Sequence, residues 1–489
     1  MLFNSHIFML LFLPLLLAGW YFLNWKKKFQ LAQGYLIGMS LWFYAYANLQ
    51  YLWLLLFSCL IGWLLSCLPE KIFSEKGKKV LTGVGCVFHL GLLGYFKYSN
   101  FFLENLNTVF HTDFPMLQIL LPVGISFYTF QQLAYLIDRC RGDAPRDSFF
   151  DYLTFMVYFP QLLQGPILLR SEFMGQLKEP ERRRFHAERF SEGIQFFVFG
   201  LAKKVLLADT LAKAVNYGYS NVSMLDSISA LLLAVGYLTE LYFDFSGYCD
   251  MAVGLGKMIG LEVAENFDAP FHSASVKEFW RRWHMTLGRF FTRYVYIPLG
   301  GNRRGKMRTL CNVMIVMLLS GLWHGAAWTF VLWGFLHGVG MIWDNLEHPH
   351  LPKKWMRQAA TFAYVCMTFV FFRAESIVQG FDVLKSIVSL KWNGFVFQMA
   401  SALDMTEFYM ITKALSMKLP GLLSWFWLGI FVVLIAICFR VLSGEKVSGV
   451  VALQRQKGYG RLYPVLLAVL FTWSMISMTG VSEYLYFSF

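Results

Sequence analysis

Two long stretches without a charged side chain limit what this chain can fold into. Residues 35–68 and residues 309–343, 34 and 35 residues long, contain no Asp, Glu, Lys or Arg. A helix rises about 1.5 Å per residue and a membrane span needs about 20 apolar residues, so each run is too long for one straight span. Each run therefore predicts two membrane helices or one helix that bends, and the first should turn near residues 47–50.

The composition agrees with a membrane protein. Hydrophobic residues make up 57% of the 489 residues and charged residues 15%, whereas soluble domains carry about 25% charged residues. The apolar runs are continuous rather than alternating, which favours helices over a barrel. We predict an all-α polytopic membrane protein with roughly eleven transmembrane helices plus re-entrant or interfacial helices. Besides the two runs above, the expected spans are residues 6–24, 80–102, 116–137, 149–169, 193–215, 225–245, 359–372, 425–441 and 463–478; residues 160–166 and 251–261 are candidates for re-entrant segments.

The formal charge of +13 comes from basic residues in short loops between apolar runs. That distribution is typical of cytoplasmic loops and argues against nucleic-acid binding. Lysines at positions 26–28, 71, 76, 78 and 79 place both early loops in the cytoplasm, so the N-terminus should lie outside, and residues 6–24 predict a first span rather than a cleaved leader. We expect one membrane domain, residues 1–489, made of N-terminal spans (1–110), a core (115–345) and C-terminal spans (346–489).

A histidine lies in an aromatic and basic segment, residues 278–294. At about 100° per residue, one helix would place Trp283 and His284 on an apolar side and Arg282 and Arg289 on the opposite side. Such a helix is expected at a membrane surface. The structural alternative is a histidine that is tucked in and donates one hydrogen bond.

The run 309–343 contains two more histidines, His324 and His337. His324 lies at least 15 residues from either end of the run, so it should be deep in the bilayer or in a cavity that reaches there. Ionisable groups at that depth are costly and usually functional. Gly321 and Gly325 would allow close approach to the backbone. The alternative for both histidines is a hydrogen bond that joins two helices.

A buried imidazole suits acyl transfer, because the reaction needs a base that is neutral near pH 7. A second polar group must orient that base or stabilise the oxyanion. His284 is a candidate for this role, since it lies 40 residues from His324 on another element. A zinc site formed by His272, His284, His324 and His337 is not expected, because the spacing fits no zinc motif. The eight cysteines include no CxxC pair, and we expect no metal and no disulfide framework.

Several collinear motifs resemble the membrane-bound O-acyltransferase family. The sequence is most similar to the branch that O-acetylates alginate and related bacterial polysaccharides. The motifs are Pro122–Phe130 (PVGISFYTF), Phe159–Ile167 (FPQLLQGPI), Tyr242–Tyr248 (YFDFSGY), Asn266-Phe267, Phe279–His284 (FWRRWH), Tyr296–Gly301 (YIPLGG), Gly321–Gly325 (GLWHG) and Phe371–Ala374 (FFRA).

The resemblance implies a ring of helices around a central funnel, with the active site at its neck. It implies that His324 is the family histidine and that His284 occupies the second active-site position. The donor would be acetyl-CoA or another acyl thioester from the cytoplasm, with no bound cofactor. The candidates for contact with this acyl donor are Arg282, Arg289, Trp283 and Trp323.

The resemblance also implies an O-acetyltransferase in a bacterial cytoplasmic (inner) membrane. It would move acetyl toward hydroxyls of an extracytoplasmic polysaccharide, of the alginate, cellulose or peptidoglycan type, with a periplasmic or secreted acetyltransferase as partner. Two alternatives stay open at this point. One is D-alanyl transfer to teichoic acid from a carrier protein, and the other is a non-enzymatic polysaccharide transporter or scaffold. Asp244 is a candidate for a paired charge within the membrane.

Overall fold

The computed structural model describes residues 1–67, 75–346, 353–442, 446–458 and 460–478. Within these ranges the regular structure consists of helices, with no strand. The all-helical prediction is therefore confirmed for the described residues. Among the described residues, six helical segments are long and apolar enough to cross a membrane: Phe8–Trp25, Leu49–Cys67, Lys76–Phe110, Ser227–Met258, Lys306–His324 and Pro420–Leu442.

The chain forms two compact units made of interleaved segments. The first contains residues 1–197, 249–265 and 289–298, and the second contains residues 198–248, 266–288 and 299–489. Between residues 197 and 299 the chain passes from one unit to the other several times, and the expected division into residues 1–110, 115–345 and 346–489 stays a prediction.

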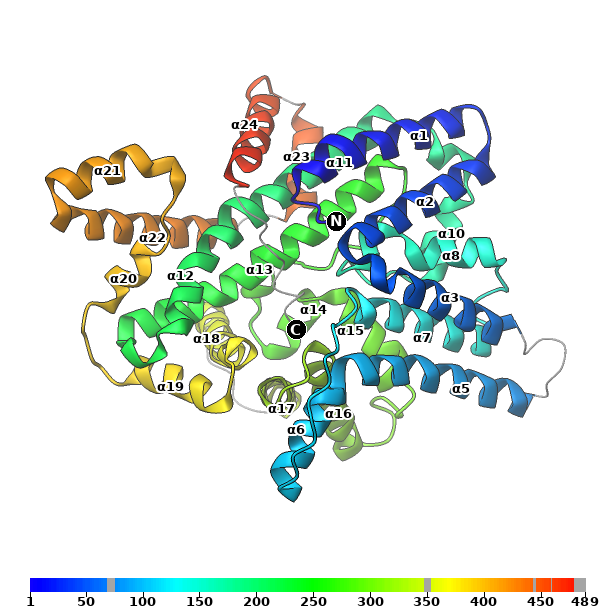
Figure 1. The fold of residues 1–489 in the computed structure, drawn as a ribbon, viewed down its shortest axis with the longest axis horizontal. Helices are drawn as coiled ribbons and strands as arrows, with labels where there is room; N and C mark the ends of the chain where they lie inside the picture. The colour runs from blue at the N-terminus through cyan, green and yellow to red at the C-terminus, as the bar shows by residue number, and fades with distance from the viewer. Residues whose placement is uncertain (68–74, 347–352, 443–445, 459, 479–489) are drawn as a thin grey trace. The chain divides into compact units, whose positions relative to one another are not determined.

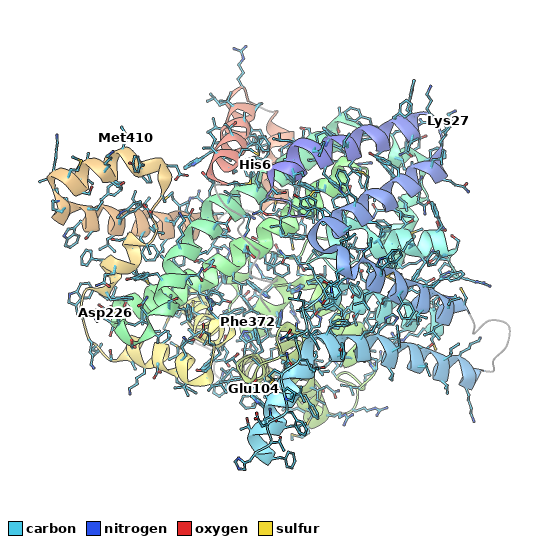
Figure 2. The ribbon with its side chains drawn as sticks, viewed as in Figure 1. His6, Lys27, Glu104, Asp226, Phe372 and Met410 are labelled. Atoms are coloured by element: carbon cyan, nitrogen blue, oxygen red, sulfur yellow. The ribbon has the colours of Figure 1, made fainter. Side chains whose placement is uncertain are left out.

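The first unit begins with an antiparallel arrangement of α1 (Leu13–Trp25) and α2 (Phe29–Asn48), which pack together. Figure 1 shows both in dark blue, and Figure 2 labels Lys27 in the turn between them. A short 3-10 turn, Leu49–Tyr51, separates α2 from α3 (Leu52–Cys67). The prediction that residues 35–68 form two helices with a break near residues 47–50 is thus confirmed.

The described part of the first unit contains further α-helices. They are α5 (Glu75–Leu93), α6 (Ser99–Phe110), α7 (Ile125–Arg141), α8 (Phe149–Val157), α9 (Phe159–Leu162), α10 (Arg170–Leu177) and most of α11 (Ala187–Ala202). The expected span 149–169 is broken between α8 and α9, as its prolines suggested, and residues 163–169 are not helical.

The expected span 116–137 is wrong in its first half, because the helix starts only at Ile125. Residues 112–122 lie along α6 as an extended segment held by two asparagines. Asn100 bonds both backbone groups of Leu117, and Asn107 bonds both backbone groups of Phe114. These side chains replace the hydrogen bonds that a helix would have supplied.

The longest described α-helix, α13 (Ser227–Met258), has 32 residues and belongs to the second unit up to Tyr248 and to the first unit from Cys249 onward. Asp226, labelled in Figure 2, caps its start by accepting a bond from the Ser229 backbone N–H at 2.8 Å. The helix runs without interruption to Met258 and ends in a turn at residues 259–260, so the candidate re-entrant segment 251–261 is helical in most of its length. The other helices of the second unit are α12 (Asp209–Ser220), α14 (Val276–Arg282), most of α15 (Met285–Phe291), α16 (Lys306–His324), α17 (Trp328–Asn345), α18 (Lys354–Arg373), α19 (Ile377–Val388), α20 (Phe395–Ser401), α21 (Tyr409–Lys418), α22 (Pro420–Leu442), α23 (Val447–Lys457) and α24 (Leu462–Ser477).

The run 309–343 forms a helical hairpin, so of the two expected forms the structure shows two helices rather than one bent helix. The 19 residues of α16 rise about 28 Å and end at His324, and three residues separate this end from the start of α17 at Trp328. The two helices pack along their length, and α17 also packs against α14 and α18.

Candidate active site

His324 ends α16 at the turn of the helical hairpin. The hairpin is closed by glycines, because a Cβ added to Gly321 would clash with the backbone oxygen of Phe330, and one added to Gly334 would clash with the backbone oxygen of Met317. This contact lets the two backbones approach more closely than larger residues would allow. The prediction of a close approach at Gly321 is confirmed, and the close approach fixes where the His324 side chain starts.

Aromatic rings surround the His324 imidazole, which is only 4% exposed. The centroid of its ring lies 4.9 Å from that of Trp323, 5.2 Å from that of Trp333 on α17 and 5.1 Å from that of Phe372 on α18. Figure 2 labels Phe372. All three rings meet the imidazole at steep angles. The imidazole is therefore held among apolar groups that limit its contact with bulk water.

His284 lies at a break between α14 and α15 rather than within one helix. α14 ends at Arg282, and the backbone of His284 has a φ of +45°, which non-glycine residues rarely adopt. The carbonyl of His284 then accepts bonds from Leu287 and Gly288, which starts α15. The expectation of one continuous amphipathic helix over residues 278–294 is therefore wrong, although its apolar side is buried as expected.

The break brings His284 toward His324. Their ring centroids are 6.4 Å apart, and the ring of Phe245, on α13, lies 4.8 Å from His284. His284 is fully buried, and this burial lowers the pKa of its imidazole to about 3. His284 lies outside the six candidate spans. Because its pKa is lowered, the imidazole is neutral at physiological pH, as a proton acceptor must be.

Asn266 holds His284 through its side-chain oxygen. The Nδ1 atom of His284 lies 3.1 Å from Oδ1 of Asn266, and the backbone N–H of Thr286 donates to the same oxygen. Sequence reasoning used Asn266 only as part of a motif. A contact between residues far apart in the chain leaves no periodic pattern in the sequence. The only signal for Asn266 was therefore that the Asn266-Phe267 motif resembles the family.

The two tryptophan candidates are both near this site. Trp323 lies next to His324, with its ring centroid 6.1 Å from that of His284. Trp283 is almost fully buried and packs against Phe267, at 5.1 Å, and Phe369, at 5.4 Å. Its place in this packing gives it a clear structural role.

The two arginine candidates are already engaged in ion pairs. Arg282 pairs with Glu278 one turn earlier at 2.8 Å. Arg289 pairs with Glu172 at 2.5 Å and donates to the carbonyl of Ile167 at 3.0 Å. Their guanidinium groups therefore contact carboxylates of the chain before any donor is considered.

His337 has both ring nitrogens occupied. Trp280 Nε1 donates to its Nδ1 at 3.2 Å, and its Nε2 lies 2.9 Å from the Thr368 hydroxyl. The ring thus joins α14, α17 and α18. This arrangement is the interhelical hydrogen-bonding alternative considered for His337.

Asp244 is one member of a buried ion-pair network. Lys204 lies 2.6 Å from Asp244 and 2.7 Å from Asp209, and the side chains of Lys204 and Asp244 are at most 2% exposed. Removing one partner of such a buried pair would leave the other charge uncompensated and would destabilise the fold.

Comparison with known proteins identifies the family. A model of the MBOAT, membrane-bound O-acyltransferase family, matches residues 144–378. The chain is 35% identical over 423 residues to a peptidoglycan O-acetyltransferase of Helicobacter pylori, covering 80% of each chain. The chain belongs to the membrane-bound O-acyltransferase family.

Other relatives in this family differ in their described substrates. A protein of Azotobacter vinelandii, described as a "probable alginate O-acetylase AlgI", is 39% identical over 389 residues, covering 77% of this chain and 76% of its own. A teichoic acid D-alanyltransferase of Streptococcus thermophilus is more distant, at 28% identity over 253 residues, covering 49% of this chain. The expected resemblance to the bacterial polysaccharide O-acetyltransferase branch is confirmed.

Family membership makes this chain a multi-pass membrane acyltransferase. It also decides against the alternative of a non-enzymatic transporter or scaffold. The matched segment, residues 144–378, contains both His284 and His324.

Proposed function

We propose that this enzyme transfers acetyl from acetyl-CoA to hydroxyls of an extracytoplasmic polysaccharide. The relatives that match most of the chain are named for O-acetylation of peptidoglycan or alginate. The D-alanyltransferases match about half of it at lower identity. The crowded aromatic surroundings of His324 also favour a small acyl group.

The observation that carries the proposal is the pair of buried imidazoles with centroids 6.4 Å apart. In the proposed reaction His324 removes the proton from the attacking hydroxyl as its oxygen bonds to the thioester carbonyl carbon. The carbon–sulfur bond then breaks, and the leaving thiolate takes the proton from the imidazolium. A positioned base of this kind typically contributes about 10²–10⁴-fold in rate.

The proposed enzyme has a defined orientation in the membrane. The N-terminus lies outside a bacterial inner membrane, and the basic loops lie in the cytoplasm, where the thioester enters. Helices that are individually short or polar join the six candidate spans to give about eleven crossings around a funnel. The attacking hydroxyl belongs either to the polysaccharide itself or to a periplasmic or secreted acetyltransferase partner that passes the acetyl group on to the polysaccharide.

The test is His324→Gln, scored by acetate released with alkali from isolated surface polymer. We expect acetate to fall by at least about 100-fold, because an amide cannot act as a base. His89→Gln is a matched control, since His89 is 1% exposed and bonds Ser58 through Nδ1 in the first unit. Full acetylation in a His324→Gln protein that is inserted at normal levels would refute the proposal. Release of D-alanine instead of acetate by the unmodified enzyme would replace acetyl with the D-alanyl alternative.

A further inference from the structure

Asn266 presents one oxygen to three groups of the segment that contains His284. Its Oδ1 lies 3.1 Å from His284 Nδ1, 3.1 Å from the Thr286 backbone nitrogen and 3.0 Å from the Thr286 hydroxyl. Asn266 and His284 are at most 1% exposed. Three hydrogen bonds to one buried oxygen form a defined cradle rather than an incidental contact.

The donors around this oxygen determine the tautomer of His284. A backbone N–H can only donate, so the atom of Asn266 that faces Thr286 must be the amide oxygen and not the nitrogen. An amide oxygen carries no proton, so the hydrogen in the contact with His284 must belong to Nδ1. Neutral imidazole has one N–H, and the lone pair is therefore on Nε2.

Backbone hydrogen bonds also hold Asn266 beside the segment that contains His284. Met285 N donates to the carbonyl of Asn266 at 2.9 Å, and Asp268 N donates to the carbonyl of Arg282 at 2.9 Å. These two bonds join residues 266–268 to the ends of α14 and α15. They explain how His284 can keep a backbone φ of +45°, which would otherwise be unfavourable.

We propose that Asn266 is a positioning residue that fixes His284 as its Nδ1–H tautomer and presents Nε2 to the active site as a proton or hydrogen-bond acceptor. The inference rests on the proposed acyl transfer for its effect on rate, but the tautomer itself does not. An asparagine amide holds the catalytic histidine in the same way in Cys-His-Asn proteases.

This assignment decides between two roles for His284. A second polar group near the base can stabilise the oxyanion, which requires a donor, or it can assist proton transfer, which requires an acceptor. With the lone pair on Nε2, His284 cannot donate from that atom to an oxyanion. Its role is therefore to receive a proton or a hydrogen bond, and oxyanion stabilisation must come from other groups.

The direct test is nitrogen-15 NMR of the full-length protein in lipid bilayers with labelled histidine. The His284 signals are assigned by their loss in His284→Gln. We expect one protonated ring nitrogen, bonded to the Asn266 side chain, and one unprotonated nitrogen, unchanged between about pH 8 and pH 5 because burial keeps the ring neutral. A proton on Nε2 with Nδ1 unprotonated in the wild-type protein would overturn the inference, whatever the enzyme's activity.

Two substitutions of Asn266 link the tautomer to catalysis. Asn266→Leu removes the acceptor, and we expect a mixture of tautomers and a rate roughly 10- to 100-fold lower. Asn266→Asp keeps an oxygen in place, so the tautomer and most of the activity should return. Its negative charge stabilises the imidazolium, so the pKa of His284 rises and the rate should begin to fall at a higher pH than in the wild type.

The readout for both is the thiol released from acetyl-CoA by membranes, normalised to inserted protein. Thr286→Val is the matched control, because it removes one of the three donors and leaves the backbone N–H and His284 in place. It should keep the wild-type tautomer and pH profile. If Asn266→Leu shows the wild-type rate and tautomer, or if Asn266→Asp leaves the pH profile unmoved, then Asn266 serves packing alone.

Discussion

His284 and His337 are both fully buried histidines in the second unit, yet their hydrogen bonds differ in kind. At His337, Trp280 donates to one ring nitrogen and Thr368 bonds the other, so both nitrogens are occupied in joining helices. At His284, an amide oxygen holds Nδ1 and assigns the lone pair to Nε2. Burial alone therefore does not distinguish the two histidines, whereas the hydrogen-bond partners around each ring do.

The largest expected effect comes from making the same substitution at both sites. A glutamine at position 337 can accept from Trp280 through its oxygen and donate to Thr368 through its nitrogen. A glutamine at position 284 can bond Asn266, but it cannot take a proton. We expect His284→Gln to lower the rate of acetyl transfer by about 100-fold and His337→Gln to leave it within about twofold.

Polymer-bound acetate, normalised to inserted enzyme, measures both variants. Equal losses in the two variants would remove the distinction between the histidines. A normal rate in His284→Gln would assign His284 to packing.

The sequence predicted several parts of this site and missed the part that distinguishes the two histidines. It predicted the helical hairpin of residues 309–343, because a charge-free run of that length cannot be one span. It placed His284 with buried aromatic residues but in a continuous helix, since a helical wheel shows which face is buried and not whether the helix is interrupted. At the interruption, Asn266 bonds His284 and the backbone of Thr286 from 18 residues before His284, and a local pattern contains no information about such a partner.

The error at residues 116–137 has a similar cause. An apolar run predicts burial or lipid contact, but the choice of helix over extended chain depends on what satisfies the backbone. Here the side chains of Asn100 and Asn107 do so for Leu117 and Phe114. Both errors therefore come from asparagines that act on a distant backbone.

The pH dependence of stability gives the next largest effect. Burial lowers the pKa of His284 from its ordinary value of 6.5 to about 3 in the folded protein. Between these values the unfolded chain binds more protons than the folded protein, so stability is lost as the pH falls below about 6.5. For this one group we expect about 2 kcal/mol of stability to be lost between pH 7 and pH 5.

Thermal unfolding of the detergent-solubilised enzyme, followed by tryptophan fluorescence, measures this loss. Other groups also titrate in this range, so the informative quantity is the difference between wild type and His284→Gln. The variant should lose less stability on acidification. Identical pH dependence in the two proteins would show that His284 can become protonated while the protein stays folded.

Trp280→Phe should have a smaller effect and should act on stability rather than catalysis. It removes the donor to His337 Nδ1 and leaves a buried acceptor unsatisfied, which typically costs about 1–3 kcal/mol. The ring contact of residue 280 with His337 is largely kept, since phenylalanine is also aromatic. We expect a lower unfolding temperature, and a rate per folded molecule within about twofold of wild type. A rate that falls with unchanged stability would place His337 in the catalytic machinery.

Thr368→Val tests the other side of the same ring and should have the smallest effect. Valine nearly matches threonine in shape, so the change removes the hydroxyl at 2.9 Å from His337 Nε2 without opening a cavity. The Thr368 hydroxyl also donates to the carbonyl of Val365, one turn earlier in α18. The Val365 carbonyl remains part of this helix in the variant. The cost is therefore that of one unsatisfied imidazole N–H, about 1 kcal/mol. In the double variant with Trp280→Phe, the two losses should not add, because without both partners the ring is free to rotate and find another bond. Strict additivity in the unfolding data would mean that Trp280 and Thr368 act independently, and that His337 does not link the two helices through one ring.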